Sequence, residues 1–152
     1  MAQRWLPNSR MIELDAARAL AAGDTARART IASAFPTPDS RRGSNFGMAG
    51  MRTMTRAEVL AGMGDLRTAV GNYEALDPKR FVMNTANEPG LTMYVRSFAA
   101  RARLYEQLGE PDKALAAFEK FLKLWPVDDP LTARERSEAR SAIARLRDAP
   151  RR

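Results

Sequence analysis

The stretch that decides the fold reads Tyr105-Glu-Gln-Leu-Gly109-Glu-Pro-Asp-Lys-Ala114. Apolar residues continue at helical spacing on both sides of it, which predicts two helices. They are Phe98, Ala102 and Tyr105 before the glycine, and Ala114, Phe118, Phe121, Leu122 and Trp125 after it, up to Pro126. Gly109 can take the left-handed conformation that ends one helix, and the acid after it can cap the next. A small residue at Ala114 lets the two helices pack closely, so we predict a helical hairpin.

The same pattern occurs twice more, as Leu20-Ala-Ala-Gly23-Asp-Thr-Ala-Arg-Ala28 and as Leu60-Ala-Gly-Met-Gly64-Asp-Leu-Arg-Thr-Ala69. Each copy has a glycine, then an acid, then an alanine five residues after the glycine. Internal repetition of this kind indicates stacked hairpins. We predict three of them, over approximately residues 9–35, 46–77 and 90–126, and a capping helix over approximately 130–147.

Boundary residues predict where these helices begin and end. Ser9 caps a first helix to about Ala22, and Asp24 caps a second to Phe35. The third runs from about Phe46 to Met63 and the fourth from Asp65 to about Leu76. Pro89, Pro111 and Pro130 open the fifth, sixth and seventh, since proline is tolerated in a first turn. The seventh has an apolar stripe of Ala139, Ala142, Ile143 and Leu146, and a wet face of Arg134, Glu135, Arg136, Glu138 and Arg140.

Laid out in this register, the chain resembles a tetratricopeptide repeat, most fully over residues 95–126 and less fully over 50–78 and 9–35. The resemblance implies an all-α fold, a right-handed superhelix of three hairpins plus a C-terminal capping helix, in a single domain over residues 1–152. Residues 118–125 with the tail 138–146 are also similar to the closing part of tetratricopeptide regions in large bacterial signalling proteins such as eukaryotic-like serine/threonine kinases. The sequence holds no kinase motif, so the resemblance implies a bacterial scaffold without that activity.

Composition excludes many chemistries. The 152 residues include no histidine and no cysteine, which removes Ser-His and Cys-His nucleophiles and His/Cys metal sites. The paired acids Asp128-Asp129 and Glu110 with Asp112 stand at helix starts, where acids favour the helix dipole. We therefore predict no enzyme, no cofactor and no metal site. The 25 basic and 18 acidic residues give a net charge of +7, spread along the chain without a basic block.

The resemblance also implies a concave groove, lined by the first helix of each hairpin, that binds a protein or peptide. Groove positions fall thirteen, ten, six and three residues before each glycine. The predicted contacts are Met51, Met54, Glu58, Arg96, Arg103 and Glu106. Methionine adapts to irregular partners, and the arginines suit an acid. The alternative for the methionines is that they fill the hairpin core, and the alternative function is nucleic-acid binding through the scattered arginines.

The chain ends carry two further expectations. No apolar run reaches the length of a signal peptide or membrane span, so we expect a cytoplasmic protein without membrane partners. Apolar residues are spread widely around the first helix. Trp5 and Leu6 can fold back over that helix, or else the exposed face docks to another copy of the chain or to an upstream domain.

Overall fold

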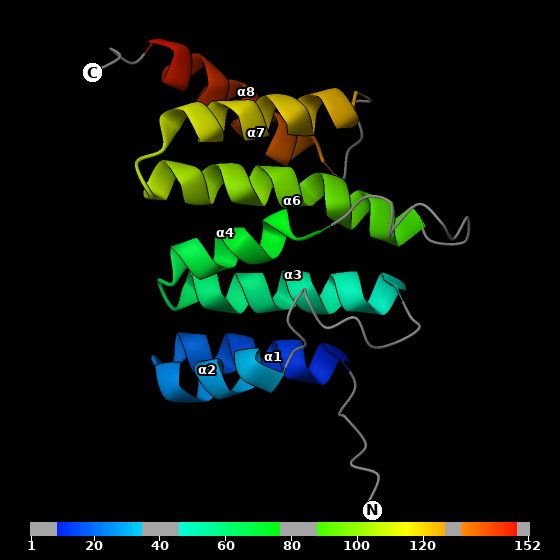
Figure 1. Cartoon of the computed structure of the whole chain (residues 1–152), viewed down its shortest axis with the longest axis vertical. Coiled ribbons are helices and arrows are strands. Elements are labelled where there is room, and N and C mark those ends of the chain that lie inside the picture. The colour runs from blue at the N-terminus through cyan, green and yellow to red at the C-terminus, as the bar shows by residue number, and fades with distance from the viewer. Residues whose placement is uncertain (1–8, 35–45, 77–87, 127–131, 149–152) are drawn as a thin grey trace, which may run out of the picture. The chain divides into compact units, whose positions relative to one another are not determined.

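The computed structural model describes residues 9–34, 46–76, 88–126 and 132–148, and all the regular secondary structure in these ranges is helical (Figure 1). The helices are α1 (Ser9–Ala21), α2 (Thr25–Ala34), α3 (Phe46–Gly62), α4 (Leu66–Glu74), α6 (Glu88–Gln107), α7 (Pro111–Leu124) and α8 (Ala133–Asp148). This confirms the predicted all-α, tetratricopeptide-like class of fold. The chain divides into two compact units, the N-terminal unit Met1–Ala75 and the C-terminal unit Leu76–Arg152. The single domain and the superhelix stay predictions.

Three glycines form the three hairpin bends, as the sequence predicts. Gly23, Gly64 and Gly109 have φ values of 69°, 83° and 70°, the left-handed region that favours glycine. At each bend the amide of the following acid donates to the carbonyl five residues back, and the glycine amide donates to the carbonyl three residues back. These paired bonds are the Schellman motif, which satisfies carbonyls left open at a helix end.

The acids that follow the glycines cap two of the three second helices. Asp24 Oδ1 accepts from the amide of Arg27 at 2.9 Å, and Asp65 Oδ1 accepts from the amide of Thr68 at 3.4 Å. Glu110 makes no such bond, and its carboxylate pairs instead with Lys113 Nζ at 2.9 Å. Pro111 does not account for the difference, because a cap would use the amide of Lys113, three residues on. The longer side chain of glutamate places its carboxylate at the Lys113 ammonium instead. The prediction of a side-chain cap is therefore wrong for Glu110.

The same positions relative to the bend glycine are buried in each of the three hairpins. Alanine occupies the position five residues after each glycine and the position seven residues before it, and all six alanines are at most 2% exposed. They are Ala16, Ala28, Ala57, Ala69, Ala102 and Ala114. The positions four residues before and nine residues after each glycine are also buried in all three hairpins. The side chains at these two positions become larger along the chain. They are two alanines in the first hairpin, a leucine and a tyrosine in the second, and a tyrosine and a phenylalanine in the third.

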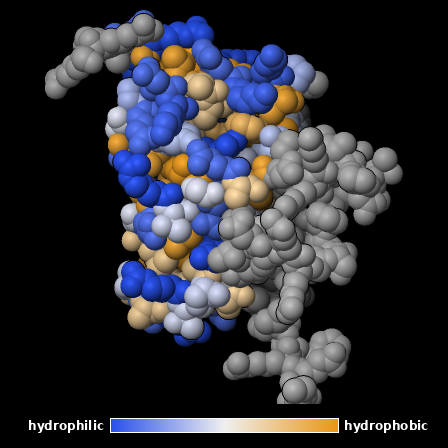
Figure 2. Space-filling view, viewed as in Figure 1, coloured by the Kyte–Doolittle hydropathy of each residue, from blue (hydrophilic) through white to orange (hydrophobic). Residues whose placement is uncertain are grey.

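Within the N-terminal unit, α1 packs with α2, both pack against α3, and α3 packs with α4. Its first hairpin is closed by a small cluster of alanines around Val59, with Leu20, Ile31 and Met63 at the margin. Within the C-terminal unit, α7 packs between α6 on one side and α8 on the other. Figure 2 shows hydrophilic residues over most of the described surface of this unit in that view, with hydrophobic residues exposed between them.

Most predicted boundaries hold to within two residues, and the start of the last helix needs a correction. α8 begins at Ala133, after Thr132, whose carbonyl accepts the first helical bond from the amide of Arg136 at 2.9 Å. Thr132 thus stands where a helix N-cap stands. Pro130 lies outside the described residues, as do Trp5, Leu6 and the predicted loop residues 36–43.

Candidate functional site

The predicted groove residues of the N-terminal unit lie on α3. The Glu58 side chain is exposed, and Met54 is buried with 7% exposure. The position that corresponds to Met54 in the third hairpin, Ala99, is also buried, at 1%. For Met54 the burial therefore favours the core alternative. The Met51 side chain lies outside the described residues.

The predicted groove residues of the C-terminal unit form three ion pairs with α8. Arg96 Nε donates to both carboxylate oxygens of Glu135 at 3.1 Å, and its Nη2 also donates to this group. Arg103 Nη2 donates to Glu138 Oε2 at 2.8 Å. In the third ion pair the acid is on α6 and the base on α8, since Glu106 accepts from Arg145 at 2.5 Å. We call these three pairs the α6–α8 charge ladder.

The spacing of the ladder shows how α8 lies. The partners are 39, 35 and 39 residues apart in sequence, so chain positions increase in the same direction on both helices. The arginine side chains of the ladder are between 42% and 65% exposed. Exposed pairs of this kind each contribute at most about 1 kcal/mol to stability. The ladder is thus a solvent-accessible row of charges that a ligand can reach.

Glu138 is shared between two arginines. Its Oε1 accepts from Arg134 Nε at 2.9 Å, one turn earlier on α8, while its Oε2 accepts from Arg103. The bond from Arg134, followed by that from Arg103, lowers the pKa of the Glu138 carboxyl below its usual value. The carboxylate is therefore held ionised at the middle of the ladder.

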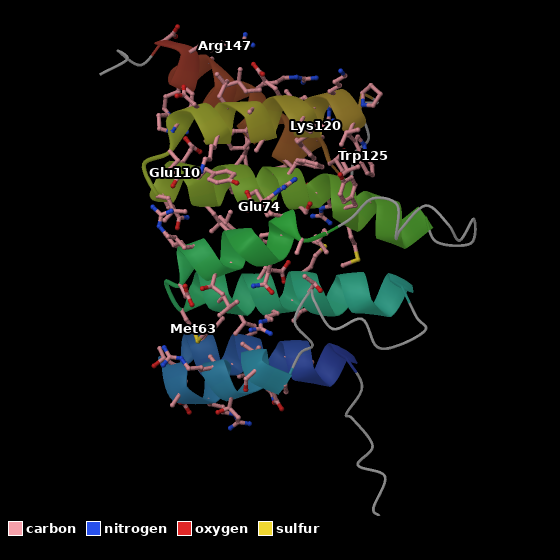
Figure 3. The ribbon with its side chains drawn as sticks, viewed as in Figure 1. Met63, Glu74, Glu110, Lys120, Trp125 and Arg147 are labelled. Atoms are coloured by element: carbon pink, nitrogen blue, oxygen red, sulfur yellow. The ribbon has the colours of Figure 1, made fainter. Side chains whose placement is uncertain are left out.

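Arg136 is placed differently from the prediction. The sequence puts it on the solvent-exposed face of the last helix, whereas the structure buries it to 5% exposure and its Nη1 donates to the carbonyl of Trp125. Trp125 follows the last residue of α7 and is labelled in Figure 3. Phe121, one turn before Trp125, is fully buried. The junction between the last hairpin and α8 therefore contains a buried guanidinium. One signal was available, because Arg136 lies three and seven residues before Ala139 and Ile143, on their stripe.

Two features that would indicate metal or membrane binding are absent from the described residues. Among the described residues, no three acidic side chains stand close enough together to hold a metal ion. No helix in the described ranges is both long and apolar enough to cross a membrane. The cytoplasmic location stays a prediction.

Comparison with known proteins finds a family similarity for one part of the chain. A family model described as tetratricopeptide repeat matches residues 95–139, which cover α6 from Val95, all of α7 and the first half of α8. This segment is similar to a tetratricopeptide repeat, a fold that generally mediates protein–protein interaction and is typically not catalytic. Comparisons with curated proteins and with solved structures give no match.

Proposed function

We propose that this protein is a non-catalytic scaffold that binds a protein or peptide through the faces built by the first helices of its hairpins. The observation that supports this most is the α6–α8 charge ladder. Five of its six residues lie within the segment 95–139 that is similar to a tetratricopeptide repeat, and Arg145 lies beyond it. The ladder contains the three predicted contacts Arg96, Arg103 and Glu106. The proposed contacts on α3 are Met51 and Glu58, while the burial of Met54, the third predicted residue there, favours a role in the core.

The ladder constrains the chemistry of the ligand. Each charge on α6 already has a partner of opposite sign on α8, so a ligand binds here by exchanging partners. An acidic ligand group competes with Glu135 for Arg96 and with Glu138 for Arg103. A basic group on the ligand meets Glu106 at the far end. A peptide complements this order of charges if it places one acid opposite each arginine and a base about one turn of α6 beyond the second acid, because Glu106 is three residues after Arg103.

The test is affinity purification from a cell extract, with and without nuclease and over a range of salt. Nucleic-acid binding falls steeply with salt, with a logarithmic slope of about 0.9 per phosphate contact. We expect a protein partner that survives nuclease treatment. Loss of all partners after nuclease treatment would instead support the nucleic-acid alternative.

A pair of variants separates binding from stability. Arg96→Glu breaks the pair with Glu135 and reverses a charge on the face. The double variant Arg96→Glu with Glu135→Arg restores the ion pair within the unit and keeps the reversed charge on α6. If Arg96 contacts the partner, both variants lose it. Recovery of the partner by the double variant would mean that Arg96 only supports the fold.

A further inference from the structure

A second surface lies on the other side of α8. A groove of about 380 Å³ opens between α7 and α8, and all its lining residues belong to the C-terminal unit. α7 contributes Glu119 and Leu122, and α8 contributes Arg140, Ile143, Ala144 and Arg147. Leu122 is half-buried and Ala144 is exposed, so apolar atoms reach the solvent along the floor.

This α7–α8 groove is separate from the charge ladder. Successive residues of a helix are rotated by about 100°. On α8 the ladder residues Glu135, Glu138 and Arg145 therefore lie about half a turn away from the centre of the groove residues. The buried stripe of Ala139, Ala142 and Ile143 runs between the two. A ligand in the groove leaves the ladder accessible.

The dimensions of the groove suit a helix. Its α8 wall extends from Arg140 to Arg147, two helical turns or about 11 Å. An amphipathic helix can lay apolar side chains spaced i, i+3 and i+7 into a furrow between two helices, over Leu122, Ile143 and Ala144.

The charge of the groove indicates which kind of helix it binds. The groove walls themselves hold Arg140 and Arg147 against the single carboxylate of Glu119, which pairs with Arg147 at 2.7 Å. The surplus positive charge favours an occupant with acids beside its apolar row.

The helices that the structure describes do not supply such an occupant. No helix in the described ranges has more acidic than basic residues, since α1 and α4 are neutral and α2, α3 and α6 are positive. Two copies joined through this groove would bring α8 against α8, positive against positive. We propose that the α7–α8 groove binds an acidic amphipathic helix of a different protein, as a second docking surface beside the proposed ladder face.

The test uses a synthetic helical peptide of roughly three turns, with leucines at i, i+3 and i+7 and glutamates on both flanks. A second peptide has lysine in place of every glutamate, and a third probe is a single-stranded thymidine oligonucleotide. Binding to the full chain is measured by fluorescence anisotropy. We expect the acidic peptide to bind with a dissociation constant on the order of 10 µM and the lysine peptide at least about tenfold more weakly.

Two matched variants locate the binding. Ala144→Glu adds a carboxylate to the groove, and Ala116→Glu adds the same group to an exposed position of α7 that does not line it. Both replace exposed helical alanines, so circular dichroism should show both folded. Ala144→Glu should weaken the acidic peptide about tenfold or more, whereas Ala116→Glu should leave it within about twofold.

Three results would overturn the proposal. One is equal binding of the acidic and lysine peptides, and another is an equal effect of the two variants. The third is binding of the oligonucleotide, sensitive to Ala144→Glu, without binding of the acidic peptide. None of these results bears on the ladder. The ladder variants change Arg96 on α6 and Glu135 on the opposite side of α8 from the groove. The two proposals therefore fail independently.

Discussion

Gly109 is the residue on which the clearest hairpin depends. A Cβ built at Gly109 meets nothing within 4 Å, so any penalty for a side chain there comes from its φ of +70° and not from a collision. We expect Gly109→Ala to lower the free energy of unfolding in urea by about 1–2 kcal/mol, and Gly109→Val to lower it further. Gly109→Asn should be milder than either, because asparagine tolerates the left-handed region.

Gly71 supplies the matched control for Gly109. It lies inside α4, and a Cβ there also meets nothing within 4 Å, but its φ is not positive. Gly71→Ala should therefore raise the free energy of unfolding by roughly 0.5–1 kcal/mol, because alanine loses less backbone entropy in a helix. The same sign for Gly109→Ala and Gly71→Ala would contradict the left-handed bend.

The Glu138 carboxyl gives a prediction about pH. Its pKa is lowered in the folded protein by Arg134 and then by Arg103, so its ion pairs are fully present at neutral pH. Their contribution to stability is lost as the pH falls through the lowered pKa of the folded state. Carbon-detected NMR titration should place this pKa below that of an exposed glutamate, and Arg134→Gln should raise it. An unchanged pKa in that variant would show that Arg134 is not the main cause.

At the scale of the element, α8 is joined to the end of α7 by the buried guanidinium of Arg136. Replacing it with methionine keeps a long side chain but leaves the Trp125 carbonyl without this donor. We expect Arg136→Met to lower the free energy of unfolding by about 1–3 kcal/mol. The control is Arg134→Met, at a side chain 92% exposed whose pair with Glu138 is one turn away, which should cost less than about 0.5 kcal/mol. Equal effects would mean that Arg136 does not hold the helix.

At the scale of the whole molecule, the graded core predicts graded stability. Four residues before and nine after the glycine, the first hairpin buries Ala19 and Ala32, whereas the third buries Tyr105 and Phe118. Burying one large apolar side chain contributes about 1.5–3 kcal/mol. In hydrogen exchange, amides of α6 and α7 should therefore be more protected than those of α1 and α2. Equal protection in the two hairpins would contradict this, and Phe118→Ala should reduce the difference by about 3–5 kcal/mol.

The local parts of this fold could be predicted from the sequence because their causes lie within a few residues. A glycine at φ near +70°, the acid after it and the alanine five residues on are properties of one bend, so all three bends were predictable. Residue type alone misjudged Glu110, since the longer side chain of glutamate places the carboxylate at the Lys113 ammonium and not at a backbone amide.

The sequence by itself determined the helices, their bends and the repeated alanine core, because backbone conformation and hydrophobic periodicity are read over one or two turns. The tertiary structure alone decided the charge ladder, the hydrogen-bond partner of Arg136 and the α7–α8 groove. The ladder joins side chains 35 to 39 residues apart, and the groove exists only where α8 packs along α7. Which charges meet depends on how helices distant in sequence are placed, and no local pattern carries that information. For Arg136 the stripe of Ala139 and Ile143 was a local sign of burial, but the Trp125 carbonyl that accepts from it was not predictable locally.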